Sequence, residues 1–169
     1  MSNCNQTHNQ TILEHGIAVH EEWLNLKPYG FLIPYWDVLQ EDIAKWDPND
    51  IQIYHIFHDC GKPFCHSQDE QGIHFRNHAE ISYQTWLEYY GEGQIATWIR
   101  HDMDIHILCA NEIDAFMQIP GSEILLLTGL AAIRANAKMF GGVESTSFKI
   151  KLKRWEQRAK AYLRRRYHV

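Results

Sequence analysis

The sequence predicts an all-α fold, a compact multi-helix bundle formed by a single domain over residues 1–169. Apolar residues recur at helical spacing along much of the chain. Helix-start signals precede several of these stretches, for example residues 11–14 (TILE) and 120–123 (PGSE). No turn dipeptide separates two runs of alternating polarity, as a β-hairpin would require. With 169 residues, of which 45% are hydrophobic, the chain is long enough to close a core without disulfides.

Seven helices are expected from the apolar periodicity and from the residues that start and stop helices. The first begins with a capping box, in which Thr11 is the N-cap residue and Glu14 follows three residues later. The polar residues 1–10 are expected to be flexible, and residues 61–75 are expected to form an exposed loop. The expected helices span about residues 12–26, 34–46, 47–59, 76–90, 94–108, 124–139 and 147–167.

Charge is distributed unevenly along the chain. The net charge is −5 at pH 7, yet nine of the sixteen Lys and Arg residues lie at 149–166, where Glu156 is the only acid. An acidic body therefore carries a basic C-terminal helix over residues 147–169. Such a helix can attract a polyanion such as an RNA end, although a solvated amphipathic face explains the same residues more simply.

The composition also bears on the compartment. No apolar run approaches the ~20 residues of a membrane span, and the polar start (MSNCN) is unlike a signal peptide. A cytoplasmic location without membrane partners is expected. The four cysteines form no dense framework, so reduced thiols are expected rather than disulfides or metal ligands.

The pair His58-Asp59 stands at the end of an apolar helical stretch and is followed by the helix-stopping residues 61–63 (GKP). Near a helix end, a neutral imidazole and an adjacent carboxylate can meet one divalent cation. The alternative is a helix C-terminus with a His that suits the helix dipole and a solvated Asp.

Further histidines surround this pair in the sequence. His15 occupies a core-facing position of the first helix, His78 opens another helix, and His101-Asp102 lies on a third. Nitrogen and oxygen donors from separate helices suit one or two ions of Mn, Fe, Co, Ni or Zn, and no thiolate in the set demands zinc. His55 is expected at the surface and His106 is expected to be structural.

The order of these motifs resembles the HD-domain metal-dependent phosphohydrolase superfamily. Residues 58–63 (HDCGKP) look like its HDxGKP box, and residues 14–19 (EHGIAV) look like its EHxxxV segment. Residues 74–80 (HFRNHAE) are similar to a segment of the HD domains attached to bacterial CCA-adding tRNA nucleotidyltransferases. The resemblance covers roughly residues 11–140 and implies an HD-domain fold with the metal site in the helical core.

The resemblance also implies ligands. His15, His58 and Asp59 match three metal ligands of the family, and His78 and His101 match positions that supply a second metal or contact phosphate in some members.

One expected ligand is missing. The family's last ligand is an Asp, but residues 127–136 (LTGLAAIRAN) contain none, and Ala132 stands where the Asp is expected. Three explanations stay open. Asp102, which we favour, or Asp104 supplies the carboxylate; the chain is a natural degenerate member; or Ala132 is a deliberate inactivating replacement.

The function implied by the resemblance is that of a phosphohydrolase or phosphodiesterase acting on a nucleotide, a cyclic nucleotide or an RNA-terminal phosphate. Asp59 is expected to orient the attacking water. Lys62, Arg76 and Arg134 are candidates to bind phosphate. A solvated loop lysine at 62 and a buried ion pair at 134 are the simpler alternatives. The alternative functions are an HD-fold diiron oxygenase and a degenerate module that binds a nucleotide or partner without turnover.

Overall fold

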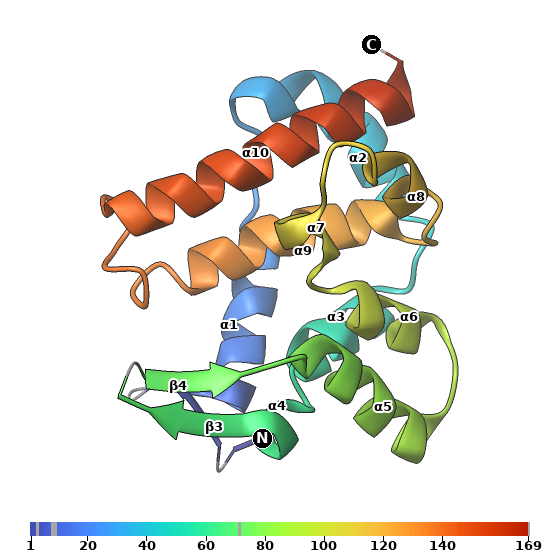
Figure 1. Ribbon diagram of the computed structural model, residues 1–169. Coiled ribbons are helices and arrows are strands. Elements are labelled where there is room, and N and C mark those ends of the chain that lie inside the picture. Colours follow the sequence, from blue (N-terminus) through green and yellow to red (C-terminus); the bar gives the residue numbers. More distant parts are fainter. Residues whose placement is uncertain (3, 8–9, 71, 169) are drawn as a thin grey trace.

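The structure is a computed structural model that describes residues 1–169 except 3, 8, 9, 71 and 169 (Figure 1). The described residues are mostly helical, as predicted, and two short antiparallel hairpins are added. The longer helices are α1 (Ile12–Leu24), α2 (Trp36–Ile43), α3 (Pro48–Phe57), α5 (His78–Tyr90), α6 (Gln94–His101), α9 (Ser122–Ala135) and α10 (Thr146–Tyr167). The shorter ones are the 3-10 helix η1 (Gly30–Tyr35), α4 (Lys62–Cys65), α7 (Asp104–Ile107) and α8 (Ile113–Met117). The strands are β1 (Asn5–Thr7), β2 (Gln10–Thr11), β3 (His66–Asp69) and β4 (Gly72–Phe75).

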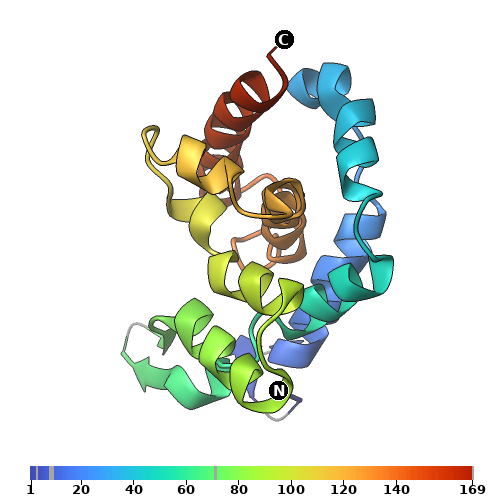
Figure 2. The same ribbon diagram turned by 90° about the vertical axis from the view of Figure 1, so that its right-hand side faces the viewer.

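Helix α9 runs through the middle of the molecule, where Figure 2 shows it almost end-on with the other helices around it. It contacts α1, α2, α7, α8 and α10. Nearly all of its residues between Ser122 and Ile133 are buried, which explains its continuous apolar sequence. These five helices are therefore positioned by their packing against α9, whereas α3 packs on α1 and α6, and α5 packs on α6.

Helix α1 packs directly on α3 at a glycine. A Cβ atom on Gly16 would lie only 2.5 Å from the backbone oxygen of Ile56. Only a residue without a side chain allows this approach. The neighbouring His15 is thereby brought beside the end of α3, where His58 is the C-cap residue.

Helix α10 lies across α9 (Figure 1). Trp155 is buried between the two helices, and its indole N–H donates a hydrogen bond to the backbone oxygen of Leu126 at 2.9 Å. The hydroxyls of Tyr162 and Ser122 are 2.9 Å apart. Because buried polar groups require such partners, these bonds fix how α10 sits on α9.

Local signals predicted several boundaries well. The capping box of Thr11 and Glu14 is present, with each residue bonding to the backbone of the other. The last helix begins at Thr146, with Ser145 as its N-cap, and ends at Tyr167 as predicted. The first helix ends at Leu24, slightly before the predicted end.

The predicted continuous helix over residues 94–108 is wrong, because the chain turns after His101 and restarts as α7. Asp102 accepts a hydrogen bond from the Tyr54 hydroxyl at 2.5 Å, and His101 bonds to Asp104 at 2.7 Å. Side-chain contacts of Asp102 and Asp104 therefore accompany the break between α6 and α7. The predicted start of a helix at Pro34 also differs, since Pro34 lies inside η1 and α2 starts at Trp36.

The loop predicted over residues 61–75 contains a helix and a hairpin. Strand β3 pairs antiparallel with β4, from His66 opposite Phe75 to Asp69 opposite Gly72. Strands β1 and β2 also pair, within the polar segment predicted to be flexible. Neither hairpin carries an Asn-Gly or Asp-Gly signal, so periodicity alone did not indicate them.

The four cysteines are free thiols, as predicted. Among the described residues, no helix combines the length and apolar character that a membrane crossing requires.

Candidate metal centre

Three side chains of the predicted set come together at the junction of α1 and α3. His15, His58 and Asp59 each offer one ligand atom, and these atoms lie within 4.8 Å of one another. Their exposed fractions are only 2%, 3% and 2%. In the part of the chain that the structure describes, no second group of this kind occurs.

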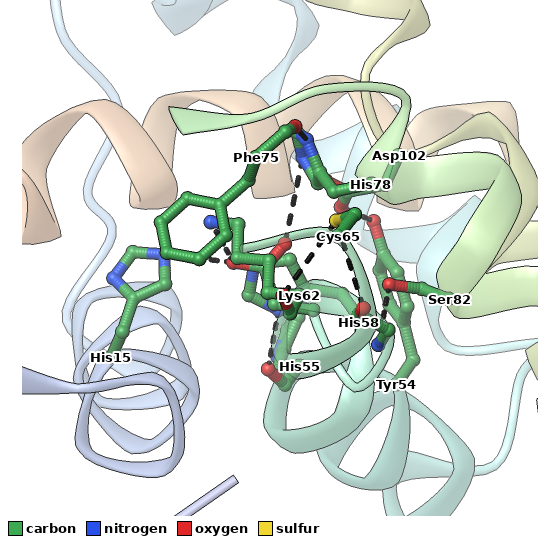
Figure 3. A network of polar contacts seen from close by, with 12 residues as sticks. His15, Tyr54, His55, His58, Lys62, Cys65, Phe75, His78, Ser82 and Asp102 are labelled. Carbon is green, nitrogen blue, oxygen red and sulfur yellow. Dashed lines mark hydrogen bonds and ion pairs between the residues drawn. The ribbon is translucent and has the colours of Figure 1, made fainter. Parts of the chain in front are cut away.

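Asp59 is the centre of this group. Its Oδ2 atom lies 3.2 Å from His58 Nε2 and 3.8 Å from His15 Nε2. Lys62 donates to the same oxygen at 2.5 Å (Figure 3). Burial favours a raised pKa for Asp59, but His58 and Lys62 outweigh it and hold the pKa well below its usual range. Asp59 is therefore an ionised carboxylate at neutral pH.

A hydrogen bond to the backbone orients the ring of His58. Its Nδ1 atom lies 2.7 Å from the backbone oxygen of His55, so Nδ1–H donates and Nε2 is turned toward Asp59. Such a bond on the rear nitrogen of an imidazole sets the tautomer that a metal ligand needs. Burial lowers the pKa of His58, but the carboxylates of Asp59 and Asp102 outweigh burial and raise it to about 9, so a bound cation would have to displace the proton from Nε2.

His15 provides the test of whether these residues fit a cation. Its Nδ1 atom is buried and has no hydrogen-bond partner among the described residues. Burial, followed by the charge of His58, lowers the pKa of His15 to about 3, so the ring is neutral. A neutral imidazole whose Nε2 atom faces a buried carboxylate oxygen at 3.8 Å fits a cation-binding role. Two imidazoles and one carboxylate suit a divalent transition metal.

Further buried polar groups pack next to His58 and Asp59. His55 is fully buried, with Nδ1 3.0 Å from His20 Nδ1 and Nε2 2.9 Å from the Thr128 hydroxyl. Burial and then the neighbouring His20 lower its pKa well below the ordinary value, so His55 is neutral. The expected surface position of His55 is wrong, because the side chain fills the junction between α1, α3 and α9.

The group opens into a cavity of about 370 Å³. This volume lies within the range of about 300–1,000 Å³ that small-molecule sites occupy. His15, His58, Asp59 and Lys62 line one part of it. Phe75 of β4 also lines the cavity and lies beside Lys62 (Figure 3). The hairpin that the sequence did not indicate thus supplies part of the wall.

Other predicted ligands lie at different distances from the group. His78 lines the cavity, and its Nε2 atom is 3.6 Å from Asp59 Oδ1. Asp102 also lines the cavity but is bonded to the Tyr54 hydroxyl. His101 is bonded to Asp104, and neither is among the described residues that line the cavity. The structure therefore brings His78 and Asp102 to the site but not His101.

The predicted phosphate-binding residues also differ in whether they line the cavity. Lys62 is almost fully buried and lines the cavity, so the alternative of a solvated loop lysine is wrong. Arg76 is exposed, and the guanidinium of Arg134 lies 5.8 Å from the ring centre of Tyr29. Neither arginine is among the described cavity-lining residues. Ala132 lines the cavity, so a carboxylate at this position would enter the cavity that the metal group also lines.

Sequence reasoning missed several lining residues. His106 of α7 and the basic residues Lys151, Arg154 and Arg158 of α10 all line the cavity. Their spacing of three and four along α10 indicated a shared face. What that face contacts depends on packing between helices far apart in the sequence.

No family model, curated protein or solved structure in our comparisons matches this chain. The resemblance to HD domains therefore rests on the sequence motifs alone.

Proposed function

We propose that this protein is an HD-type, metal-dependent phosphohydrolase or phosphodiesterase acting on a nucleotide, a cyclic nucleotide or another phosphate ester. One observation carries the proposal. The buried group of His15, His58 and Asp59 opens into a cavity that also holds Lys62. A cation site beside an ammonium group in a ligand-sized cavity suits phosphoryl chemistry.

His15, His58 and Asp59 would hold the cation. A divalent cation in such a site supplies a Lewis acid, which acidifies water and neutralises charge on a phosphoryl oxygen. The structure supports this role for Asp59 because the residue is ionised and accessible from the cavity through its position on the wall. Its Oδ1 atom faces His78 and not Lys62, so Asp59 can orient a water molecule with that oxygen.

Lys62 has two roles in this proposal. In the absence of a ligand its ammonium group compensates the charge of Asp59. When a phosphate ester enters, the same group can donate to a non-bridging phosphate oxygen, since Lys62 lines the cavity. The ring of Phe75 lies 5.2 Å from Lys62 Nζ and limits the access of water to the ion pair.

The missing Asp of the HD pattern bears on whether the site is complete. Of the two acids considered as replacements, Asp102 lines the cavity whereas Asp104 is bonded to His101 outside it. Asp102 is therefore our candidate for the remaining carboxylate. It would act near the cation while its other contact, the Tyr54 hydroxyl, holds it in place.

A binding module without turnover is the second candidate function, and Ala132 is the observation that favours it. Ala132 lines the cavity at the position where the family pattern has Asp. A diiron oxygenase is less well supported, because it needs a second set of ligands. The described residues contain a single group of three metal-binding side chains, and His101 lies apart from it.

The test is a substrate screen with added metal. Protein loaded with Mn²⁺, Co²⁺ or Ni²⁺ would be assayed with nucleoside monophosphates, 3′,5′-cyclic nucleotides and 2′,3′-cyclic phosphates. Phosphate ester hydrolysis that disappears in the His58→Ala/Asp59→Ala double variant supports the proposal. Metal binding without hydrolysis of any of these esters would replace it with the binding module.

A further inference from the structure

The α10 row, defined as Lys151, Arg154 and Arg158, lines the same cavity as the metal group. The three residues follow one another at spacings of three and four, so they lie on one face of the helix. The adjacent face of α10 is buried through Trp155 and Ala159. The row is thus held in position by a helix whose neighbouring face is anchored in the core.

The row differs from three of the other basic residues of α10 in its partners. Those three residues pair with carboxylates: Lys149 with Glu144, Arg165 with Asp114 and Arg166 with Asp42. Across the described part of the chain, no carboxylate forms an ion pair within 4.0 Å of the row. The row therefore brings positive charge to the cavity wall that no ion pair of the described residues neutralises.

The side chains of the row are nevertheless placed by specific contacts. Arg158 Nε donates to the backbone oxygen of Leu108 at 2.8 Å. Lys151 Nζ lies 4.9 Å from the ring centre of Phe140, which also lines the cavity. Partial burial and the charge of Arg154 lower the pKa of Arg158, as expected for like charges held close together. A bound anion would relieve this repulsion.

The cavity has room for more than one phosphoryl group. Its volume of about 370 Å³ corresponds to about twelve water molecules at about 30 Å³ each. Apolar side chains cover much of the remaining wall, including Met103, Ile133, Met139 and Phe140. The cavity therefore suits an organic molecule with an apolar portion in addition to its charged groups.

We propose that the α10 row is a second anion subsite, and that the preferred ligand is a small phosphate ester carrying a second phosphate group. One phosphoryl group would lie at the metal group with Lys62, and the other would bind Lys151, Arg154 and Arg158. The identity of the first position rests on the proposed function. The second position rests on the row itself.

The test uses adenosine 3′,5′-bisphosphate and adenosine 5′-monophosphate as probes, with dissociation constants measured by calorimetry on the full chain. Measurements with EDTA exclude turnover, and a repeat with Mn²⁺ shows the effect of the cation. We expect the bisphosphate to bind at least about tenfold more tightly than the monophosphate, because a charge-assisted contact is worth that much. The Lys151→Gln/Arg154→Gln variant should lose this preference.

The matched control is Lys153→Gln/Arg164→Gln, which removes two exposed charges from α10 outside the cavity-lining set. It should keep the preference, so a general effect of net charge is separated from the subsite. Equal affinities in the unsubstituted protein, or an equal loss in both variants, would overturn the proposal.

Two further readouts distinguish a failure of the proposed subsite from a failure of the proposed function. Metal content and monophosphate hydrolysis report on the metal group, and the preference for the bisphosphate under EDTA reports on the row. A preserved preference in a protein without metal or turnover would still support the subsite. Markedly tighter binding of a short oligoribonucleotide than of the bisphosphate would overturn the assignment to a small molecule.

Discussion

The two charged walls of the cavity are built in opposite ways. His15, His58 and Asp59 are buried and held by backbone and side-chain contacts on α1 and α3. Lys151 and Arg154 are exposed on α10 and form no ion pair among the described residues. A buried charge requires compensation, whereas an exposed one is solvated at little cost. Changes in the buried wall should therefore alter stability and metal binding, and changes in the α10 wall should alter ligand affinity alone.

The largest effect is expected for Asp59→Asn. The amide keeps the size of the side chain but removes the charge that would hold a cation and orient water. Turnover of the best ester found in the screen should fall by at least about 10⁴-fold. Asp104→Asn is the control, because Asp104 bonds to His101 outside the cavity-lining set, and its turnover should stay within a few fold. Similar losses in both variants would place the chemistry elsewhere.

The next largest effect is a pH dependence of the free energy of unfolding that His15 causes. In the native state the pKa of His15 is lowered to about 3 from its ordinary value of 6.5. Between these two values the unfolded chain binds a proton that the native state excludes. The contribution of neutral His15 to the free energy of unfolding is therefore fully present above pH 6.5 and is lost as the pH falls toward 3. Between pH 6.5 and 3 the free energy of unfolding falls by about 1.4 kcal/mol per pH unit because of this residue.

His15→Phe should remove this loss. In metal-free protein, urea unfolding at several pH values should show the free energy of unfolding falling less steeply below pH 6.5 in the variant than in the unsubstituted protein. His66→Phe, which changes an exposed histidine of the hairpin, should leave the slope unchanged. Identical slopes for His15→Phe and the unsubstituted protein would show that His15 is not buried as a neutral ring.

Lys62→Met probes the competition between lysine and cation for Asp59 Oδ2. Removing the ammonium leaves His58 as the remaining positive partner of the buried carboxylate, which should destabilise the metal-free protein by about 2 kcal/mol. Saturating Mn²⁺ should recover much of this loss, because the cation compensates the same oxygen. The rise in Tm on adding Mn²⁺ should therefore be larger in the variant. An equal rise in both proteins would argue that the cation binds away from Asp59.

The smallest effect is expected for Ala132→Asp. Because Ala132 lines the cavity, the added carboxylate should strengthen Mn²⁺ binding by about tenfold. Ala132→Asn adds a side chain of the same size without the charge and should give little gain. If neither variant binds Mn²⁺ more tightly, then Asp102 or another group already completes the site and an inactivating replacement at 132 is not supported.

The features that the sequence predicted best are those that depend on residues close together along the chain. The capping box at Thr11, the end of α3 at His58 and the inward position of His15 all follow from residues within a few positions. Those features place the buried wall of the cavity. The metal group was accessible from the sequence for this reason.

What was missed depends on contacts between distant segments. The turn after His101 coincides with a bond between Tyr54 and Asp102, which are 48 positions apart. The position of His106 and the α10 row follows from the packing of α7 and α10 around α9. A basic amphipathic helix has the same sequence pattern whether its charged face meets solvent or a cavity. Only the tertiary structure distinguishes the two.

The central claim is that His15, His58 and Asp59 bind a cation, and elemental analysis tests it most directly. Purified protein, loaded with Mn²⁺ or Co²⁺ and freed of excess metal, should retain about one or two ions per chain. The His58→Ala/Asp59→Ala variant should retain none, while the control variant His101→Ala/Asp104→Ala, which removes a His-Asp pair outside the cavity-lining set, should retain the full amount. Metal absent from the unsubstituted protein, or retained when His58 and Asp59 are replaced, would contradict the claim.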